Sequence, residues 1–291
     1  MKTEVDKRAR EKNISIIGAS ILYSVTLLSP RVILLTSLIG GAFVSSVSAQ
    51  GTETLRSVSS RPGVTQPFIL VEPAGSPVAS VILFTGGEGV VGFKGSGPFP
   101  RGGNFLVRNR QRFAAHGLLT AVIEVPSDHT AGYGRFRTAE AHATDVAAVM
   151  TVLRQVARVP LWLVGTSKGT VSAVNVAARL KTGGPDGIVL TSSITRTAQQ
   201  TSETVFDAGL SEVRVPTLVV HHEQDACVVT PAADAQGLIG RVRAPRKELR
   251  LIQGGAGGAS GETACGPFSA HGYFGVDGEV VKVIADWIRQ P

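Results

Sequence analysis

Short apolar runs alternate with helical patterns from residue 54 to the end of the chain, and this alternation restricts the fold more than any other feature. Most of the runs are apolar on both faces, as strands buried in a parallel sheet are. The runs cover residues 68–71, 81–85, 118–125, 161–165, 187–190, 216–221 and 249–252. Apolar side chains recur at helical spacing in residues 139–157, 170–180 and 280–288. The pattern predicts an α/β fold, a single domain with a mostly parallel central sheet and helices on both faces.

The start of the chain has a different character. A charged stretch, residues 1–12, is followed by two apolar stretches between residues 14 and 47, and the second ends in small residues that suit a signal peptidase. We therefore expect residues 1–49 to be a signal peptide cleaved after Ala49, residues 50–291 to be the folded domain, and the protein to be exported to the periplasm or secreted. The alternative is a retained membrane anchor, although neither apolar stretch alone comfortably reaches ~20 residues.

The charge of the chain is mildly basic. The formal net charge is +7, and removal of residues 1–49 would leave +4. No basic helix, aromatic-interleaved stripe or known nucleic-acid motif accompanies this charge, so a solvated basic surface is favoured over a nucleic-acid partner. Membrane contact is expected only through residues 1–49, if they are retained.

An apolar strand at residues 161–165 leads into Gly165-Thr-Ser167-Lys-Gly169 and then into a helical pattern. This G-x-S-x-G arrangement is typical of a nucleophile elbow, in which the serine occupies a sharp, strained turn and the two glycines let helix and strand approach closely. Gly and Ser are common residues, so an ordinary strand-to-helix turn is the alternative. The flanking strand and helix favour Ser167 as a nucleophile.

From about residue 66 onward the chain resembles the α/β-hydrolase family, whose catalytic residues follow in the order Ser, acid, His. The resemblance implies that Asp225, in a loop that follows a strand, is the acid. Glu223 in the same loop and Asp207 are its alternatives. His271, in Ser-Ala-His-Gly-Tyr-Phe ahead of the last amphipathic helix, matches the family's base.

The same resemblance implies an oxyanion hole after the strand at residues 81–85. Thr85-Gly86 stands where the family usually has His-Gly, so the donor is expected among the amides of Gly86, Gly87 and Glu88, with plain turn glycines as the alternative. The second donor is expected to be the amide of Lys168. Its ammonium could also attract anionic substrates, but a role for the backbone alone is favoured.

The connection at residues 86–103 contains eight glycines and two prolines and is expected to be mobile or functional. Its neighbourhood carries apolar residues that suit either an acyl pocket or lid, or simple anchoring of the loop: Val90, Val91, Phe93, Phe99 and Phe105. It also carries cations that form either a solvated face or a site for an acidic group: Lys94, Arg101, Arg108, Arg110 and Arg112.

The resemblance further implies that the loops carrying Cys227 and Cys265 meet beside the site. We predict a disulfide between them, with two buried free thiols as the alternative. The remaining histidines have simpler structural explanations, and consecutive His221 and His222 would point to opposite faces of a strand. No metal site at zinc-like spacing and no cofactor are expected.

Small, cap-poor hydrolases such as dienelactone hydrolases and carboxylesterases are the members most similar in size. The resemblance implies hydrolysis of a carboxylic ester or thioester in a small acyl substrate through an acyl-enzyme, using Ser167, His271 and Asp225. An acyltransferase on the same scaffold and a noncatalytic envelope binding protein are the alternatives.

Overall fold

The computed structural model describes residues 51–93, 99–255 and 263–290. The predicted signal peptide or anchor, together with Lys94, lies outside these ranges. Within them, no helix combines the length and apolar character needed to cross a membrane.

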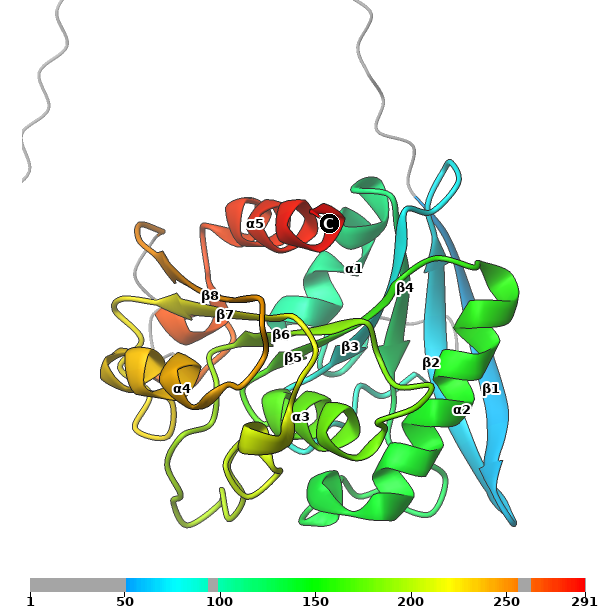
Figure 1. Ribbon diagram of the computed structural model, residues 1–291, viewed down its shortest axis with the longest axis horizontal. Helices are drawn as coiled ribbons and strands as arrows, with labels where there is room; N and C mark the ends of the chain where they lie inside the picture. The colour runs from blue at the N-terminus through cyan, green and yellow to red at the C-terminus, as the bar shows by residue number, and fades with distance from the viewer. Residues whose placement is uncertain (1–50, 94–98, 256–262, 291) are drawn as a thin grey trace, which may run out of the picture. The chain divides into compact units, whose positions relative to one another are not determined.

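The core of the domain is one eight-stranded sheet with the order β1-β2-β4-β3-β5-β6-β7-β8 (Figure 1). The strands are β1 (Thr52–Arg61), β2 (Val64–Glu72), β3 (Ala79–Phe84), β4 (Leu118–Ile123), β5 (Leu161–Thr166), β6 (Gly187–Thr191), β7 (Thr217–His222) and β8 (Lys247–Ile252). β1 pairs antiparallel with β2, and β2 pairs antiparallel with β4. All other neighbours in the sheet are parallel. The predicted mostly parallel α/β sheet is therefore confirmed.

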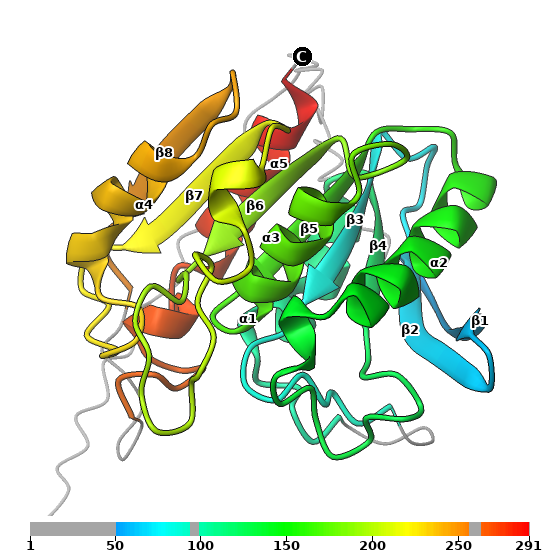
Figure 2. The same ribbon diagram turned by 60° about the horizontal axis from the view of Figure 1, so that its bottom comes forward.

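Helices cover both faces of this sheet (Figures 1 and 2). The α-helices are α1 (Phe105–Ala115), α2 (Glu140–Val156), α3 (Gly169–Arg179), α4 (Ala235–Arg241) and α5 (Asp277–Arg289). Apolar residues of α1 and α5 form one core with the sheet, and those of α2, α3 and α4 form the other. β3 serves both cores because successive side chains alternate between faces: Ile82 belongs to one core and Leu83 to the other. Burial on both faces explains the continuous apolar runs in the sequence.

Four short 3₁₀ turns lie in the connections of the described ranges: η1 (Phe136–Thr138), η2 (Leu210–Glu212), η3 (Ala232–Asp234) and η4 (Ala270–Gly272). The loops that follow β3, β5 and β7 all leave from the carboxyl edge of the sheet, because these strands are parallel. In α/β sheets, ligands bind at this edge.

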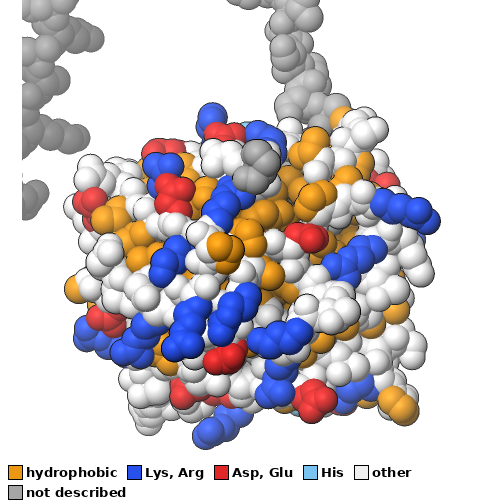
Figure 3. Space-filling model, in the orientation of Figure 1, with side chains coloured by type: hydrophobic (Ala, Val, Ile, Leu, Met, Phe, Trp, Pro, Cys, Tyr) orange, Lys and Arg blue, Asp and Glu red, His pale blue; other side chains and the backbone are white. Residues whose placement is uncertain are grey.

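Basic side chains are spread over the face drawn in Figure 3, with acidic side chains among them. In the described part of the chain, some basic side chains lie near the ends of helices, for example Arg154 in the last turn of α2 and Arg179 in the last turn of α3. Cations near a helix C-terminus interact favourably with the helix dipole.

Candidate active site

Ser167 lies at the turn between β5 and α3, with a backbone φ of +53°. This left-handed conformation is strained for a residue other than glycine. The neighbouring glycines make the turn possible, because there is no room for a side chain at either. A Cβ atom at Gly165 would lie 2.4 Å from the carbonyl oxygen of Gly169, and one at Gly169 would lie 2.0 Å from that of Phe84. The local geometry is the sharp, strained strand-to-helix turn that the sequence predicts for Ser167.

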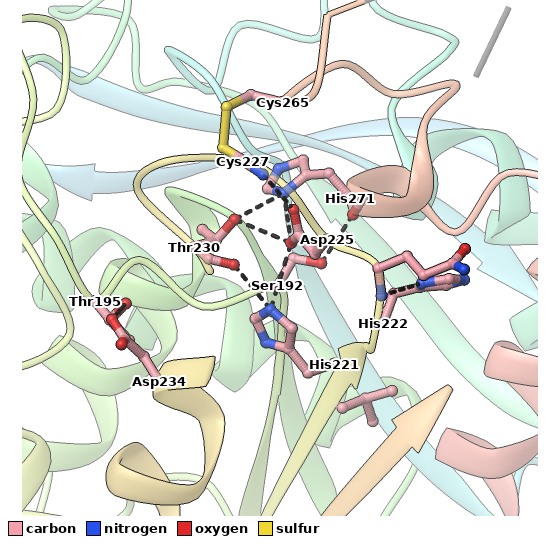
Figure 4. A network of polar contacts seen from close by, with 12 residues as sticks. Ser192, Thr195, His221, His222, Asp225, Cys227, Thr230, Asp234, Cys265 and His271 are labelled. Atoms are coloured by element: carbon pink, nitrogen blue, oxygen red, sulfur yellow. Dashed lines mark hydrogen bonds and ion pairs between the residues drawn. A yellow bond between two sulfur atoms is a disulfide. The ribbon is translucent and has the colours of Figure 1, made fainter. Parts of the chain in front are cut away.

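Asp225 and His271 meet through a hydrogen bond of 3.0 Å between Oδ2 of the carboxylate and Nδ1 of the imidazole (Figure 4). Asp225 follows β7 in the chain, and His271 lies in η4 after β8. Both side chains are buried. The other carboxylate oxygen of Asp225 accepts the amide of Cys227 at 2.9 Å, and the hydroxyl of Thr230 donates to Oδ2 at 3.0 Å.

A second histidine contacts the same carboxylate. Nε2 of His221 lies 3.4 Å from Oδ2 of Asp225 and 2.9 Å from the carbonyl oxygen of Thr230. Burial opposes ionisation of Asp225, but hydrogen bonds from His221, His271 and the Cys227 amide outweigh it and hold the pKa of this carboxyl well below its usual range. Sequence reasoning gave His221 no role at the site. The contact depends on the turn after β7, where the amide of Asp225 donates to the carbonyl of His222, so spacing in the sequence gave no signal.

The alternative acids lie in other environments. Glu223 is exposed and accepts a hydrogen bond from the side chain of Gln253. Asp207 accepts the amide and hydroxyl of Thr204, a local contact three residues away in sequence. Of the three candidate carboxylates, Asp225 is the one hydrogen-bonded to His271 among the described residues.

The histidine loop is held from two sides. Tyr273, fully buried and with φ of +57°, donates its hydroxyl to the carbonyl of Val220 in β7. Arg108 in α1 donates to the carbonyls of Pro267 and Gly272 and pairs with Asp277 at 2.6 Å. Arg108 therefore anchors the loop that carries His271. It is neither part of a solvated face nor a site for an acidic group of a substrate, the two roles that the sequence left open for it.

Ser167 and His271 both line a cavity of about 410 Å³ at the carboxyl edge of the sheet. Phe105 and Phe268 form part of its apolar wall, and Arg101 is also in its lining. Within the described ranges, no hydrogen bond joins Ser167 to His271. Such bonds are often long in ligand-free structures and tighten when substrate binds.

The expected oxyanion donors are close to the serine. A Cβ atom at Gly86 would lie 3.0 Å from Cβ of Ser167, and Gly86 and Gly87 both line the cavity. Among the described residues, the amides of Gly86, Gly87, Glu88 and Lys168 have no hydrogen-bond acceptor. Glu88, the third donor expected after β3, is not in the lining of the cavity. Lys168 is also the N-cap of α3, where the positive end of the helix dipole lies. Unpaired amides at such a position are what an oxyanion hole requires.

The side chain of Lys168 pairs with Glu88 at 2.6 Å. This pair neutralises the ammonium and gives no support to its attracting anionic substrates. Arg110 likewise pairs with Glu53 at 2.8 Å, and Arg112 donates to Asn109.

Cys227 and Cys265 form a disulfide, with their Cα atoms 4.7 Å apart, so the predicted bridge is confirmed. Cys265 also lines the cavity. Ligand-type atoms of Asp225, Cys227 and His271 lie within 4.8 Å of one another, but the sulfur of Cys227 is in the disulfide and is no thiolate. The cluster therefore consists of the hydrogen-bonded Asp225–His271 pair and the disulfide beside it.

Comparison with known proteins places the fold. No family model and no curated protein matches the chain in sequence. Solved structures do match it. A dienelactone hydrolase from Anabaena variabilis has a TM-score of 0.57 at 17% identity, over 82% of this chain and 98% of that one. Est1E from Butyrivibrio proteoclasticus, with ferulic acid bound, has a TM-score of 0.55 at 14% identity, over 81% and 100% of the two chains.

A lidless α/β serine hydrolase from Xanthomonas campestris matches with a TM-score of 0.52 at 14% identity, over 80% of this chain and 94% of that one. At such identities the likeness establishes the fold. The chain has the α/β-hydrolase fold, as its sequence resemblance predicts, and its structural neighbours include a dienelactone hydrolase, esterases and α/β serine hydrolases.

Proposed function

We propose that the protein is a serine hydrolase that cleaves carboxylic ester or thioester bonds through an acyl-enzyme. One observation carries the proposal: Ser167, on a strained turn, and His271, hydrogen-bonded to the buried Asp225, line the same cavity. A binding role needs none of these features, so they favour catalysis over a noncatalytic envelope protein.

In the proposed reaction, Oγ of Ser167 attacks the acyl carbonyl and His271 takes its proton. Nδ1 of His271 donates to Asp225, which leaves Nε2 as the nitrogen that exchanges protons. Asp225 fixes this tautomer and stabilises the imidazolium. The amides of Gly86 or Gly87 and of Lys168 bind the oxyanion, the alcohol or thiol leaves with the proton from His271, and water then releases the acid. The reaction uses only these groups and water.

The cavity volume falls within the usual range for small-molecule sites, about 300–1,000 Å³. Its wall combines aromatic rings with a few polar groups. This composition supports a small acyl substrate and agrees with the proposed ester or thioester class.

Labelling with a fluorophosphonate probe tests the proposal. The wild-type protein is expected to become covalently labelled at Ser167, and the Ser167→Ala variant is expected to stay unlabelled. A panel of esters and thioesters of increasing chain length then defines the acyl group. Transfer to added alcohols or amines in preference to water would identify an acyltransferase, and an unlabelled wild-type protein would favour the noncatalytic alternative.

We also propose that the protein is exported. The disulfide supports this, because such bonds persist in oxidising compartments. N-terminal sequencing of the protein from its host is expected to begin at Gln50, after cleavage following Ala49. A sequence beginning at Met1 or its neighbour would instead identify a retained anchor.

A further inference from the structure

The first five residues of the loop that follows β3 have all of their backbone carbonyls engaged. From residue 85 to residue 89, every backbone carbonyl accepts a hydrogen bond. Gly86 accepts from the amide of Gly89, Glu88 from the amide of Tyr133, and Gly89 from the hydroxyl of Thr85. The remaining two carbonyls, those of Thr85 and Gly87, accept from a single atom, Nη2 of Arg137, at 3.0 and 3.2 Å.

These carbonyls determine where the amides of the loop point. A trans peptide group is planar, so its N–H points opposite to its C=O. By holding the carbonyl of Thr85, Arg137 fixes the direction of the Gly86 amide. By holding the carbonyl of Gly87, it fixes the peptide that carries the Glu88 amide. The peptide between these two carries the Gly87 amide, so it is held at both ends, and its own carbonyl accepts from the amide of Gly89. The amides of Gly86 and Gly87 have no acceptor among the described residues, and both glycines line the catalytic cavity.

Arg137 is a charged residue that is buried beneath the loop after β3. Its side chain is 2% exposed, and burial lowers its pKa to about 10. Its hydrogen-bond partners are neutral: the two carbonyls and the hydroxyl of Ser172 in α3, which lies 2.7 Å from Nη1. Its guanidinium also lies 4.5 Å from the ring centroid of Tyr133. Within the described ranges, no carboxylate forms an ion pair with it.

A buried cation without a carboxylate is costly, so burial for stability alone does not account for Arg137. Its forked guanidinium joins the loop after β3 to the helix that begins beside Ser167. A lysine has one compact ammonium and cannot reproduce this fork. The positive charge also lies on the carbonyl side of the loop, where it polarises the peptide groups so that their N–H ends become better donors.

We propose that Arg137 is a positioning residue for the oxyanion hole. It holds the peptide group before Gly86 and the one after Gly87, so that the amides of Gly86 and Gly87 face the oxygen of the tetrahedral intermediate. This inference rests on the proposed serine-hydrolase function and adds a residue that acts through the backbone without touching substrate.

Two measurements on Arg137→Met test this role: steady-state kinetics, and the ionisation of the hemiketal that Ser167 forms with a ¹³C-labelled trifluoromethyl ketone, followed by NMR. Since removal of one oxyanion donor costs about 100- to 1,000-fold, loosening the peptides on either side of the Gly86–Gly87 pair is expected to lower kcat by about 10- to 100-fold, with KM nearly unchanged. The ionisation constant of the hemiketal is expected to fall by a similar factor.

The matched control is Ser172→Ala, which removes the partner of Nη1 and leaves both carbonyl contacts of Nη2 in place. It is expected to lower thermal stability while keeping the hemiketal ionisation of the wild type. A purely structural Arg137 would lower stability in both variants and change the ionisation in neither, and that result overturns the inference. If Arg137→Met does not fold, Arg137→Lys is measured in its place. A hemiketal ionisation constant below that of the wild type supports the role, and an unchanged ionisation constant overturns it.

Failure of this inference is distinguishable from failure of the proposed function. If Ser167→Ala still hydrolyses esters or still forms the hemiketal, the proposed function itself is wrong. If Ser167 is required and Arg137→Met ionises the hemiketal as the wild type does, only the role of Arg137 is wrong.

Discussion

At the scale of single residues, Asp225 is the group on which the proposed mechanism depends most. His221, Thr230 and His271 all contact Oδ2. A single hydrogen bond to His271 would be enough to fix its tautomer, so this oxygen has two partners more than that role needs. Because its pKa is well below the usual range, Asp225 stays ionised through neutral and mildly acidic pH.

We expect Asp225→Asn to lower kcat by about 10⁴-fold, since an amide no longer selects the productive tautomer of His271. The loss of stability should be smaller than the loss of activity, because asparagine keeps the shape of the site. Kinetics and urea unfolding of the purified variant give both quantities. The matched control is Glu223→Gln in the same loop, which should remain active. An inactive Glu223→Gln with an active Asp225→Asn would mean that the acid is misassigned.

His142, in α2, is a second residue with a measurable effect. Its ring is fully buried against Phe84 and Tyr133, neither ring nitrogen has a hydrogen-bond partner among the described residues, and burial lowers its pKa to about 3. The unfolded chain therefore takes up a proton at this side chain before the folded one does. As pH falls from the ordinary value of 6.5 towards 3, His142 should destabilise the fold increasingly.

His142→Leu removes this buried polar ring at similar volume. We expect the variant to be more stable than the wild type by about 1–2 kcal/mol at pH 7. At pH 4 the difference should grow by about 3 kcal/mol, since each unit below the unfolded pKa contributes about 1.4 kcal/mol. Urea unfolding at the two pH values measures it. A difference that does not change with pH would show that the ring is solvated or hydrogen-bonded.

At the scale of elements, the site is a meeting of loops from the carboxyl edge of the sheet. The disulfide joins the loop after β7 to the one that precedes η4, and Arg108 joins the latter to α1. The amide of Cys227 donates directly to the carboxylate of Asp225. The disulfide therefore fixes the position of this carboxylate in addition to joining the two loops.

Reduction of the disulfide is expected to lower turnover before it unfolds the protein. The bridge closes a loop of 38 residues, which corresponds to about 4 kcal/mol on the chain-entropy model. Activity and far-UV circular dichroism, followed together through a titration with dithiothreitol, give the order of events. Turnover and secondary structure lost in one step would mean that the bridge stabilises the fold and does not align the site.

At the scale of the whole molecule, the parallel strands could be predicted because burial on both faces produces continuous apolar runs. β1 could not be predicted in this way. It pairs with one neighbour at the edge of the sheet, its residues are largely exposed or half-buried, and its sequence TETLRSVSSR contains no apolar run.

The strained turn at Ser167 could be predicted because the residues that form it are neighbours in the sequence. The positions of Arg137 and Arg108 could not be predicted. Their partners are mainly backbone carbonyls that only the folded chain brings near.

The central claim is that Ser167 and His271 work as one catalytic unit. Its most direct test is the turnover of Ser167→Ala, His271→Ala and the double variant, each purified and shown to be folded. In such units a single replacement removes nearly all of the effect, so each variant should lose on the order of a million-fold in kcat and the double variant should lose no more. Retained turnover in Ser167→Ala, or losses that multiply in the double variant, would contradict the account.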